Sequence, residues 1–221
     1  MAEQLVFEWP AGVALGADDF FVSSANRTAY AMIGAAGGWP EGKLVLAGPS
    51  GSGKSHLARV FQTQTDAMII PASEITATPP PPTAIIVEDM EQLPPEGEAA
   101  MFHLHNHQRH TGRPLLMTAQ QPPARWPIAL PDLASRMQAT TVATIDDPDD
   151  DLLTALILKL FTDRQITPPL ALASYLALRI ERSFAAAADI VAKLDAIALR
   201  DSKAVNQRMA AALLDNQPTS E

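Results

Sequence analysis

Residues 43–62 of this chain, KLVLAGPSGSGKSHLARVFQ, decide the fold. The apolar run 43–47 predicts a short buried strand. Leu57, Ala58 and Phe61 recur on one face of a helix that begins near Lys54. The glycine-rich residues between strand and helix match the pattern G-x-x-x-x-G-K-[ST]. Strand, loop and helix in this order make half of a βαβ unit.

The loop predicts a site for the phosphates of a nucleotide. Glycine lets successive backbone N–H groups converge on phosphate oxygens, and the helix N-terminus adds partial positive charge. The ammonium group of Lys54 would neutralise the β and γ phosphates, and the Ser55 hydroxyl would bind Mg²⁺. The nucleotide-binding set is Gly48, Pro49, Ser50, Gly51, Ser52, Gly53, Lys54, Ser55 and His56.

Further apolar runs extend the unit into an α/β domain, a five-stranded, doubly wound parallel sheet. They predict strands at 67–72, 83–89, 114–119 and 140–145, with helices between them, notably at 97–112. After residue 146 only helical periodicity remains, which predicts a small all-helical lid domain with helices at 151–164, 168–181, 183–201 and 203–214. We expect a flexible peptide at 1–12, a nucleotide-binding domain at 13–147 and the lid at 148–221.

Composition narrows the possible functions. The 221 residues carry a formal charge of −9, so non-specific DNA binding through a positive field is disfavoured. The absence of cysteine removes disulfides, thiolate zinc sites and cysteine nucleophiles. Neither a cationic leader nor an apolar run of about 18 residues is present, so we expect a cytoplasmic protein without membrane contact.

Carboxylates and hydroxyls at predicted strand ends suggest the rest of the site. Glu88 and Asp89 end the run AIIVED and would approach Mg²⁺, although a structural ion pair is the alternative. Thr118 ends the next strand, where it would orient a water, sense the γ phosphate or simply cap a turn. Asp147 before Pro148, with acidic residues in the next turn, favours a capped helix start over a metal site.

Three histidines fall on one face of the predicted helix at 97–112. His103, His107 and His110 have the spacing i, i+4, i+7, which could bind a metal. Neither carboxylate nor cysteine joins them on that face, which favours an ordinary surface helix.

From about residue 4 to residue 214 these features resemble the AAA+ superfamily and, within it, the DnaA clade. FFVSSANRTAYAMI (20–33) is similar to the segment that packs beside adenine in that clade, which implies that Phe21, Val22 and Asn26 contact the base. The sequence Ser-His-Leu at 55–57 resembles the Thr-His-Leu that follows the loop in that clade. LPDLASRM (130–137) is similar to its arginine-finger helix and resembles the Hda-like branch most.

The resemblance implies a regulator of replication initiation. Arg136 would act in trans on the γ phosphate of ATP bound to DnaA, unless it is only a surface arginine that caps its helix. QLVFEW (4–9) is similar to peptides that dock on the DNA polymerase sliding clamp (β), which implies clamp contacts by Gln4, Leu5, Phe7 and Trp9. The alternative is that these residues fold back on their own domain.

The chain stops at Glu221 without the basic DNA-reading domain of DnaA, so we expect an AAA+ module that makes no sequence-specific DNA contact and that could form a homo-oligomer.

Two departures from the family pattern bear on the chain's own ATP turnover. The sensor arginine of the lid would fall at Ala185, with Arg182 as the nearest substitute, and Glu88 stands where the family has aspartate. Both favour a nucleotide-gated adaptor with weak or absent intrinsic ATPase activity. The alternatives are a DnaA-clade ATPase that loads helicase or remodels initiation complexes, and a small-molecule kinase, whose arginine-rich lid this Ala/Leu-rich segment does not resemble.

Overall fold

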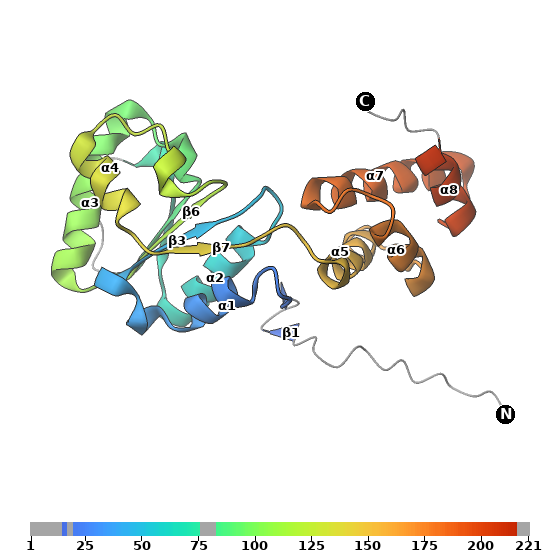
Figure 1. Ribbon diagram of the computed structural model, residues 1–221, viewed down its shortest axis with the longest axis horizontal. Helices are drawn as coiled ribbons and strands as arrows, with labels where there is room; N and C mark the ends of the chain where they lie inside the picture. Colours follow the sequence, from blue (N-terminus) through green and yellow to red (C-terminus); the bar gives the residue numbers. More distant parts are fainter. Residues whose placement is uncertain (1–14, 17–19, 76–82, 216–221) are drawn as a thin grey trace.

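The computed structural model of the chain describes residues 15–16, 20–75 and 83–215. Its centre is a five-stranded, fully parallel sheet with the spatial order β4-β5-β6-β3-β7 (Figure 1). Each strand predicted from the sequence is confirmed, with slightly shorter bounds in most. The strands are β3 (Lys43–Ala47), β4 (Met68–Pro71), β5 (Ile85–Glu88), β6 (Leu115–Ala119) and β7 (Val142–Thr144).

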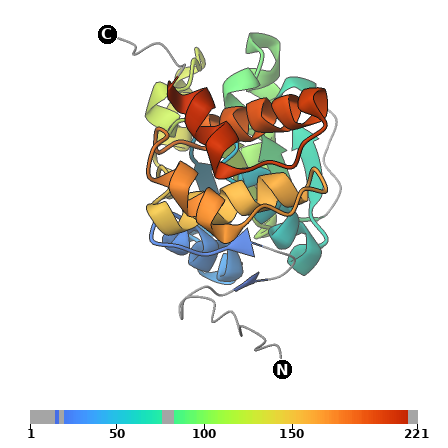
Figure 2. The ribbon, with the colours of Figure 1, turned by 90° about the vertical axis from the view of Figure 1, so that its right-hand side faces the viewer.

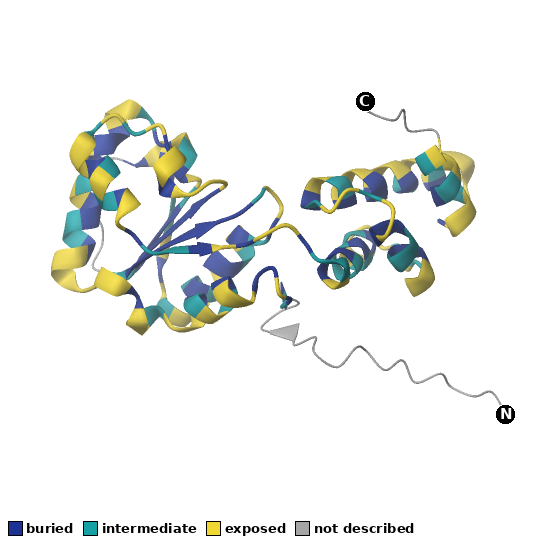
Figure 3. Cartoon of the chain, in the orientation of Figure 1, coloured by how far each residue is buried: buried dark blue, intermediate teal, exposed yellow. Residues whose placement is uncertain are grey.

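Helices cover both faces of the sheet. On one face, α1 (Arg27–Gly34) and α2 (Lys54–Thr65) pack against Leu44 and Leu46 of β3. On the other face, α3 (Glu98–Thr111) and α4 (Pro131–Gln138) pack against Val45 and Ala47. Successive residues of a strand point to opposite faces, so β3 contributes to two cores and is buried along its whole length (Figure 3).

The remaining helices share a third hydrophobic core. They are α5 (Asp150–Thr162), α6 (Leu170–Ala177), α7 (Phe184–Asp201) and α8 (Gln207–Asp215), and they lie beyond the carboxyl end of β7 (Figures 1 and 2). The expected domain boundary at 147/148 falls in the loop between β7 and α5.

Polar caps fix where two of these helices start. The acidic run does cap a helix, but at Asp149 instead of the predicted Asp147, because the Asp149 carboxylate accepts the Leu152 N–H at 2.8 Å and α5 begins at Asp150. The predicted helix at 203–214 begins later, at Gln207, because Asn206 caps it by accepting the Met209 N–H at 3.0 Å.

Two short strands, β1 (Leu15–Gly16) and β2 (Phe20–Phe21), pair antiparallel ahead of α1. The clamp-peptide prediction at Gln4, Leu5, Phe7 and Trp9 lies outside the described residues. Within the described ranges, none of the helices has both the length and the apolar character that crossing a membrane requires.

Candidate nucleotide site

The glycine-rich loop leaves the carboxyl end of β3, the second strand from one edge of the sheet. Gly51 and Gly53 have φ of +79° and +91°, in the left-handed region that favours glycine. A Cβ on Gly48 would lie 2.9 Å from the Cβ of Ile145, and one on Gly53 would lie 2.9 Å from the Phe20 ring. Both close approaches therefore require glycine, and the loop presents bare backbone in front of α2.

Lys54, the first residue of α2, turns its side chain into this loop. Its Nζ donates to the carbonyl oxygens of Gly48 and Pro49, each at 2.8 Å. Burial lowers the pKa of Lys54, whereas the carboxylates of Glu91 and Asp89 act to raise it. An ammonium group held this way is placed to exchange carbonyl oxygens for those of a phosphate.

Two buried polar atoms at the loop have no hydrogen-bond partner among the described residues, namely Ser52 Oγ and His56 Nε2. Unpaired buried polar atoms cost free energy, so native proteins rarely keep them without a reason. A polyphosphate on the loop would supply acceptor oxygens beside Ser52 and α2. The residues present therefore fit a bound nucleotide phosphate chain, which would be held by the predicted set 48–56.

The carboxyl ends of β5 and β6 bring Asp89 and Thr118 together. Asp89 adopts a left-handed φ of +57°, and its N–H donates to the buried Thr118 Oγ1 at 3.2 Å. This contact gives Thr118 the turn-supporting role that the sequence left as one alternative. Glu88 is half-buried at the last position of β5, whereas Asp89 is exposed.

The site fits Mg²⁺ held mainly by oxygen ligands. In the described part of the chain, no three His, Cys, Asp or Glu side chains gather as a metal-binding group. Nucleotide-bound Mg²⁺ needs no such group, because phosphate oxygens and waters supply most of its ligands and one or two carboxylates complete the set. Ser55, Glu88 and Asp89 are the residues that would hold it, and the ion would neutralise charge on the phosphates.

Sequence reasoning missed Glu91, which lies in the turn Met90–Gln92 after β5. Both of its carboxylate oxygens accept the Gln120 N–H, at 3.1 and 3.3 Å, so the end of β6 fixes its position. Of the two carboxylates that act on Lys54, Glu91 acts more strongly than Asp89. Its place one turn after Glu88 is the signal that could have found it.

On the side predicted to contact the base, Asn26 has a structural role. It is 2% exposed; its Nδ2 donates to the Phe21 carbonyl at 2.8 Å, and its Oδ1 accepts the Ser23 N–H at 2.9 Å. Phe21 and Val22 are half-buried against the core beneath α1 and α2. Asn26 thus braces the segment that the sequence assigns to the base.

Phe20 lies against the loop, and the sequence analysis did not select it. Its ring stacks on His56, with centroids 5.2 Å apart, and on Tyr30, with centroids 5.8 Å apart. The left-handed glycine at 53 is what leaves room for that ring.

The helical part reaches the loop through Phe184, the first residue of α7. Phe184 is 6% exposed within the core of α1 and α2, and a Cβ on Gly51 would lie 3.4 Å from its own Cβ. Ala185, at the predicted sensor position, is exposed. Arg182, its nearest substitute, donates to Asp150 Oδ2 at 3.0 Å rather than to the loop.

Arg136 lies at the other end of the sheet from this loop. It stands on α4, where its positive charge helps to lower the pKa of His105. His105 Nε2 is 2.7 Å from Nζ of Lys43, the first residue of β3. The loop follows the last residue of β3, about 13 Å farther along the strand at roughly 3.3 Å per residue. Arg136 is therefore far from the nucleotide site of its own chain.

The guanidinium group of Arg136 makes neither an ion pair nor a hydrogen bond with any described residue. Its nearest neighbour of note is the Phe102 ring, whose centroid lies 5.9 Å away. His103 and His110 are exposed on α3 and His107 is half-buried, so the predicted histidine face lies on the outer side of the helix.

Neither a protein-family model nor a curated protein matches this sequence. Solved structures do resemble the fold. Domain III of the replication initiation protein DnaA from Thermotoga maritima has a TM-score of 0.71 at 18% identity, covering 91% of this chain and 95% of that one. AMPPCP-bound DnaA from Aquifex aeolicus has a TM-score of 0.65 at 14% identity, covering 84% of this chain and 65% of that one.

The fold is shared with a motor protein of another kind. The RuvB Holliday junction branch migration motor from Thermotoga maritima has a TM-score of 0.57 at 15% identity, covering 78% of this chain and 61% of that one. These likenesses agree with the parallel five-stranded sheet and the helices around it. The chain therefore has an AAA+ fold like that of DnaA domain III.

Proposed function

We propose that the chain is an Hda-like AAA+ regulator of replication initiation, which binds ADP or ATP with Mg²⁺ and promotes hydrolysis of ATP bound to DnaA. The observation that carries the proposal is the unpaired guanidinium group of Arg136, at the opposite end of β3 from the chain's own glycine-rich loop. The likeness to AMPPCP-bound DnaA supports an adenine nucleotide as the ligand.

Among the described residues, none supplies an anion to this arginine. In phosphoryl transfer a guanidinium group stabilises the charge that builds on the phosphate oxygens, an effect of about 10³ to 10⁵ in the rate of GTPases. Arg136 cannot act on the nucleotide of its own loop, because the length of the strand separates them. It therefore acts on a nucleotide held by a second protein, and the clade resemblance makes DnaA that protein.

The chain's own ATP turnover is weak or absent in this proposal. Ala185 places a methyl group where the clade has a lid arginine, and Arg182 is committed to Asp150. Glu88 extends the metal-side carboxylate by one methylene. Asp89 and Thr118 would still take part in whatever hydrolysis the site supports, because they stand together at the strand ends.

The proposed regulator reaches the replication machinery through residues 4–9. Gln4, Leu5, Phe7 and Trp9 would dock on the sliding clamp, where burial of each large apolar side chain contributes about 1.5–3 kcal/mol. A change of nucleotide on the glycine-rich loop would be transmitted to α7 through Phe184, which contacts that loop. Such a protein would work in the cytoplasm, near the nucleoid, without direct sequence-specific DNA binding.

Single-turnover hydrolysis of ATP preloaded on DnaA tests this function. The intact chain, mixed with clamp loaded on DNA, should accelerate hydrolysis, and Arg136→Ala should abolish the acceleration. Arg208→Ala is the matched control, because Arg208 is an exposed arginine on α8. Gln4→Ala combined with Phe7→Ala should abolish capture of the chain by immobilised clamp.

Two results would contradict the proposal. One is an intact chain that leaves the hydrolysis of DnaA-bound ATP unchanged, and the other is an Arg136→Ala variant that stimulates as well as the wild type. Unchanged clamp capture by the Gln4 and Phe7 variant would remove the docking step alone.

A second candidate function is a DnaA-clade ATPase that loads helicase or remodels initiation complexes. The specific observation in its favour is that the site keeps Lys54 next to the carboxylates of Asp89 and Glu91. Steady-state turnover by the isolated chain, abolished by Lys54→Ala, would support it over the adaptor.

A further inference from the structure

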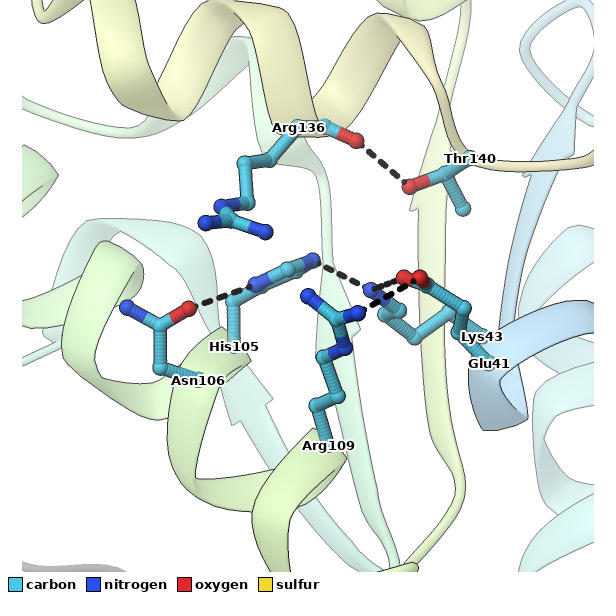
Figure 4. Close-up of polar contacts among 7 residues, drawn as sticks. All are labelled: Glu41, Lys43, His105, Asn106, Arg109, Arg136 and Thr140. Atoms are coloured by element: carbon cyan, nitrogen blue, oxygen red, sulfur yellow. Dashed lines mark hydrogen bonds and ion pairs between the residues drawn. The ribbon is translucent and has the colours of Figure 1, made fainter.

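A polar cluster with a buried lysine and a buried histidine lies beneath Arg136, at the amino end of β3 (Figure 4). Its centre is Lys43, whose side chain is 4% exposed and whose Nζ donates to Glu41 Oε2 at 2.7 Å. The same Nζ lies 2.7 Å from Nε2 of His105, a residue with 0% exposure. A lysine ammonium group can only donate, so Nε2 of His105 is the acceptor.

The contact with Lys43 fixes the tautomer of His105, and burial together with the Lys43 charge keeps the imidazole neutral. The imidazole proton must be on Nδ1, which lies 3.5 Å from Asn106 Oδ1. Burial first, and then the charge of Lys43, lower the pKa of His105 to about 4, with Arg136 adding to the effect. His105 is thus neutral at physiological pH. Its neighbours are Lys43, Glu41, Asn106, Arg109 and Arg136, and the positive charges of Lys43 and Arg136 favour the neutral imidazole (Figure 4).

The carboxylate of the cluster is fully engaged elsewhere. Glu41 pairs with Lys43 through Oε2 and with Arg109 through Oε1, the second contact at 3.0 Å. Neither oxygen forms an ion pair with Arg136. With two cations and one carboxylate, the cluster has no carboxylate to spare, and it leaves the Arg136 guanidinium group without a counter-ion.

The α3 side chains that Arg136 faces include an aromatic ring and a neutral imidazole. Phe102 and His105 are three residues apart on α3, so both side chains lie on one side of that helix. The Phe102 ring is within the range of about 6 Å over which an aromatic face attracts a guanidinium group. Thr140 adds a backbone constraint, since its hydroxyl donates to the Arg136 carbonyl oxygen at 2.9 Å and ties the end of α4 (Figure 4).

We propose that Phe102 and His105 are positioning residues for Arg136. The aromatic ring and the neutral imidazole support the guanidinium group without forming an ion pair with it. The Lys43–Glu41–Arg109 network beneath keeps His105 neutral and keeps the Glu41 carboxylate bound to other cations. Arg136 is thereby held ready for an anion on a second protein. This inference rests on the proposed function for the identity of that anion, a nucleotide phosphate.

Kinetics with DnaA test the role of Phe102. At a saturating concentration of the chain, Phe102→Leu should slow the stimulated hydrolysis by about two- to five-fold, the range expected for an exposed cation–π contact. The concentration that gives half of the maximal stimulation should stay the same, and Phe102→Tyr should restore the rate. A wild-type rate for Phe102→Leu would overturn the inference, as would an equal loss for both variants, because that would indicate packing alone.

NMR of the isolated chain tests the same geometry without any activity. Imidazole ¹⁵N shifts should show His105 protonated on Nδ1 and unprotonated on Nε2 at pH 7. The Arg136 Nε–H signal should shift in Phe102→Leu and return toward the wild-type position in Phe102→Tyr. A His105 that carries its proton on Nε2, or an Arg136 signal that ignores Phe102, would refute the positioning role.

The two experiments separate the two proposals. Failure of the wild-type chain to stimulate DnaA would remove the proposed function and leave the NMR result to decide the positioning role. Stimulation that depends on Arg136 but not on Phe102 would remove the positioning role and leave the proposed function in place.

Discussion

Replacing His105 with glutamine should make the stability of the chain less sensitive to mild acid. The wild-type imidazole is completely buried, and its pKa falls from 6.5 to about 4 on folding, mainly because burial disfavours the charged form. As the pH drops below 6.5, the unfolded chain therefore takes up a proton at this position that the folded chain does not. Stability is lost on going down in pH, because the unfolded state binds more protons.

The size of the effect follows from the two pKa values. Between pH 7.5 and pH 5.5, a site with a pKa of 6.5 unfolded and about 4 folded loses about 1 kcal/mol of folding free energy. Going farther down, to pH 4, would raise the loss to about 3 kcal/mol. The upper window is preferable because the isoelectric point is about 5.0, where the chain is least soluble. Glutamine stays uncharged and can still offer Lys43 an acceptor.

Urea unfolding at pH 7.5 and pH 5.5 measures this difference. Wild type should lose about 1 kcal/mol more between the two pH values than His105→Gln, whatever the stability of the variant at pH 7.5. His103→Gln removes an exposed histidine from the same helix and should keep the wild-type difference. Equal losses in wild type and His105→Gln would refute the argument that His105 is held neutral.

Three further changes test the site and its supports. Lys54→Ala should abolish the thermal stabilisation by ADP with Mg²⁺, which amounts to about 2.7 kcal/mol for a ligand at 100 times its Kd; calorimetry and melting curves measure it. Phe184→Ala should cost about 3 kcal/mol in denaturant unfolding, since it empties a buried site between α7 and the glycine-rich loop. Glu98→Gln should cost about 1–2 kcal/mol, because the buried Glu98 carboxylate accepts the N–H groups of Ala129 (2.9 Å) and Leu130 (2.6 Å) just before α4. Intact ADP stabilisation in Lys54→Ala, or unchanged unfolding in the other two variants, would count against these assignments.

Much of the site was predictable because it is local. The glycine-rich loop and Lys54 are contiguous, and glycine spacing alone indicates backbone that must turn left-handed at Gly51 and Gly53. Glu88 and Asp89 were visible as acids at the end of an apolar run, where a buried strand has to stop. The start of α5 was likewise visible in its acidic run, although the cap is Asp149 and not Asp147, and the cap at Asn206 was not predicted.

The sequence by itself determined the sheet, its helices and the position of the phosphate loop, because these follow from periodicity and from residues adjacent along the chain. Only the tertiary structure decided that Phe20 rather than Phe21 stacks against His56, that Glu91 joins Asp89 near Lys54, and that a neutral His105 lies under Arg136. Those facts depend on contacts between elements that are distant in sequence. Burial beneath α4, together with a contact to Lys43 62 positions away, keeps His105 uncharged.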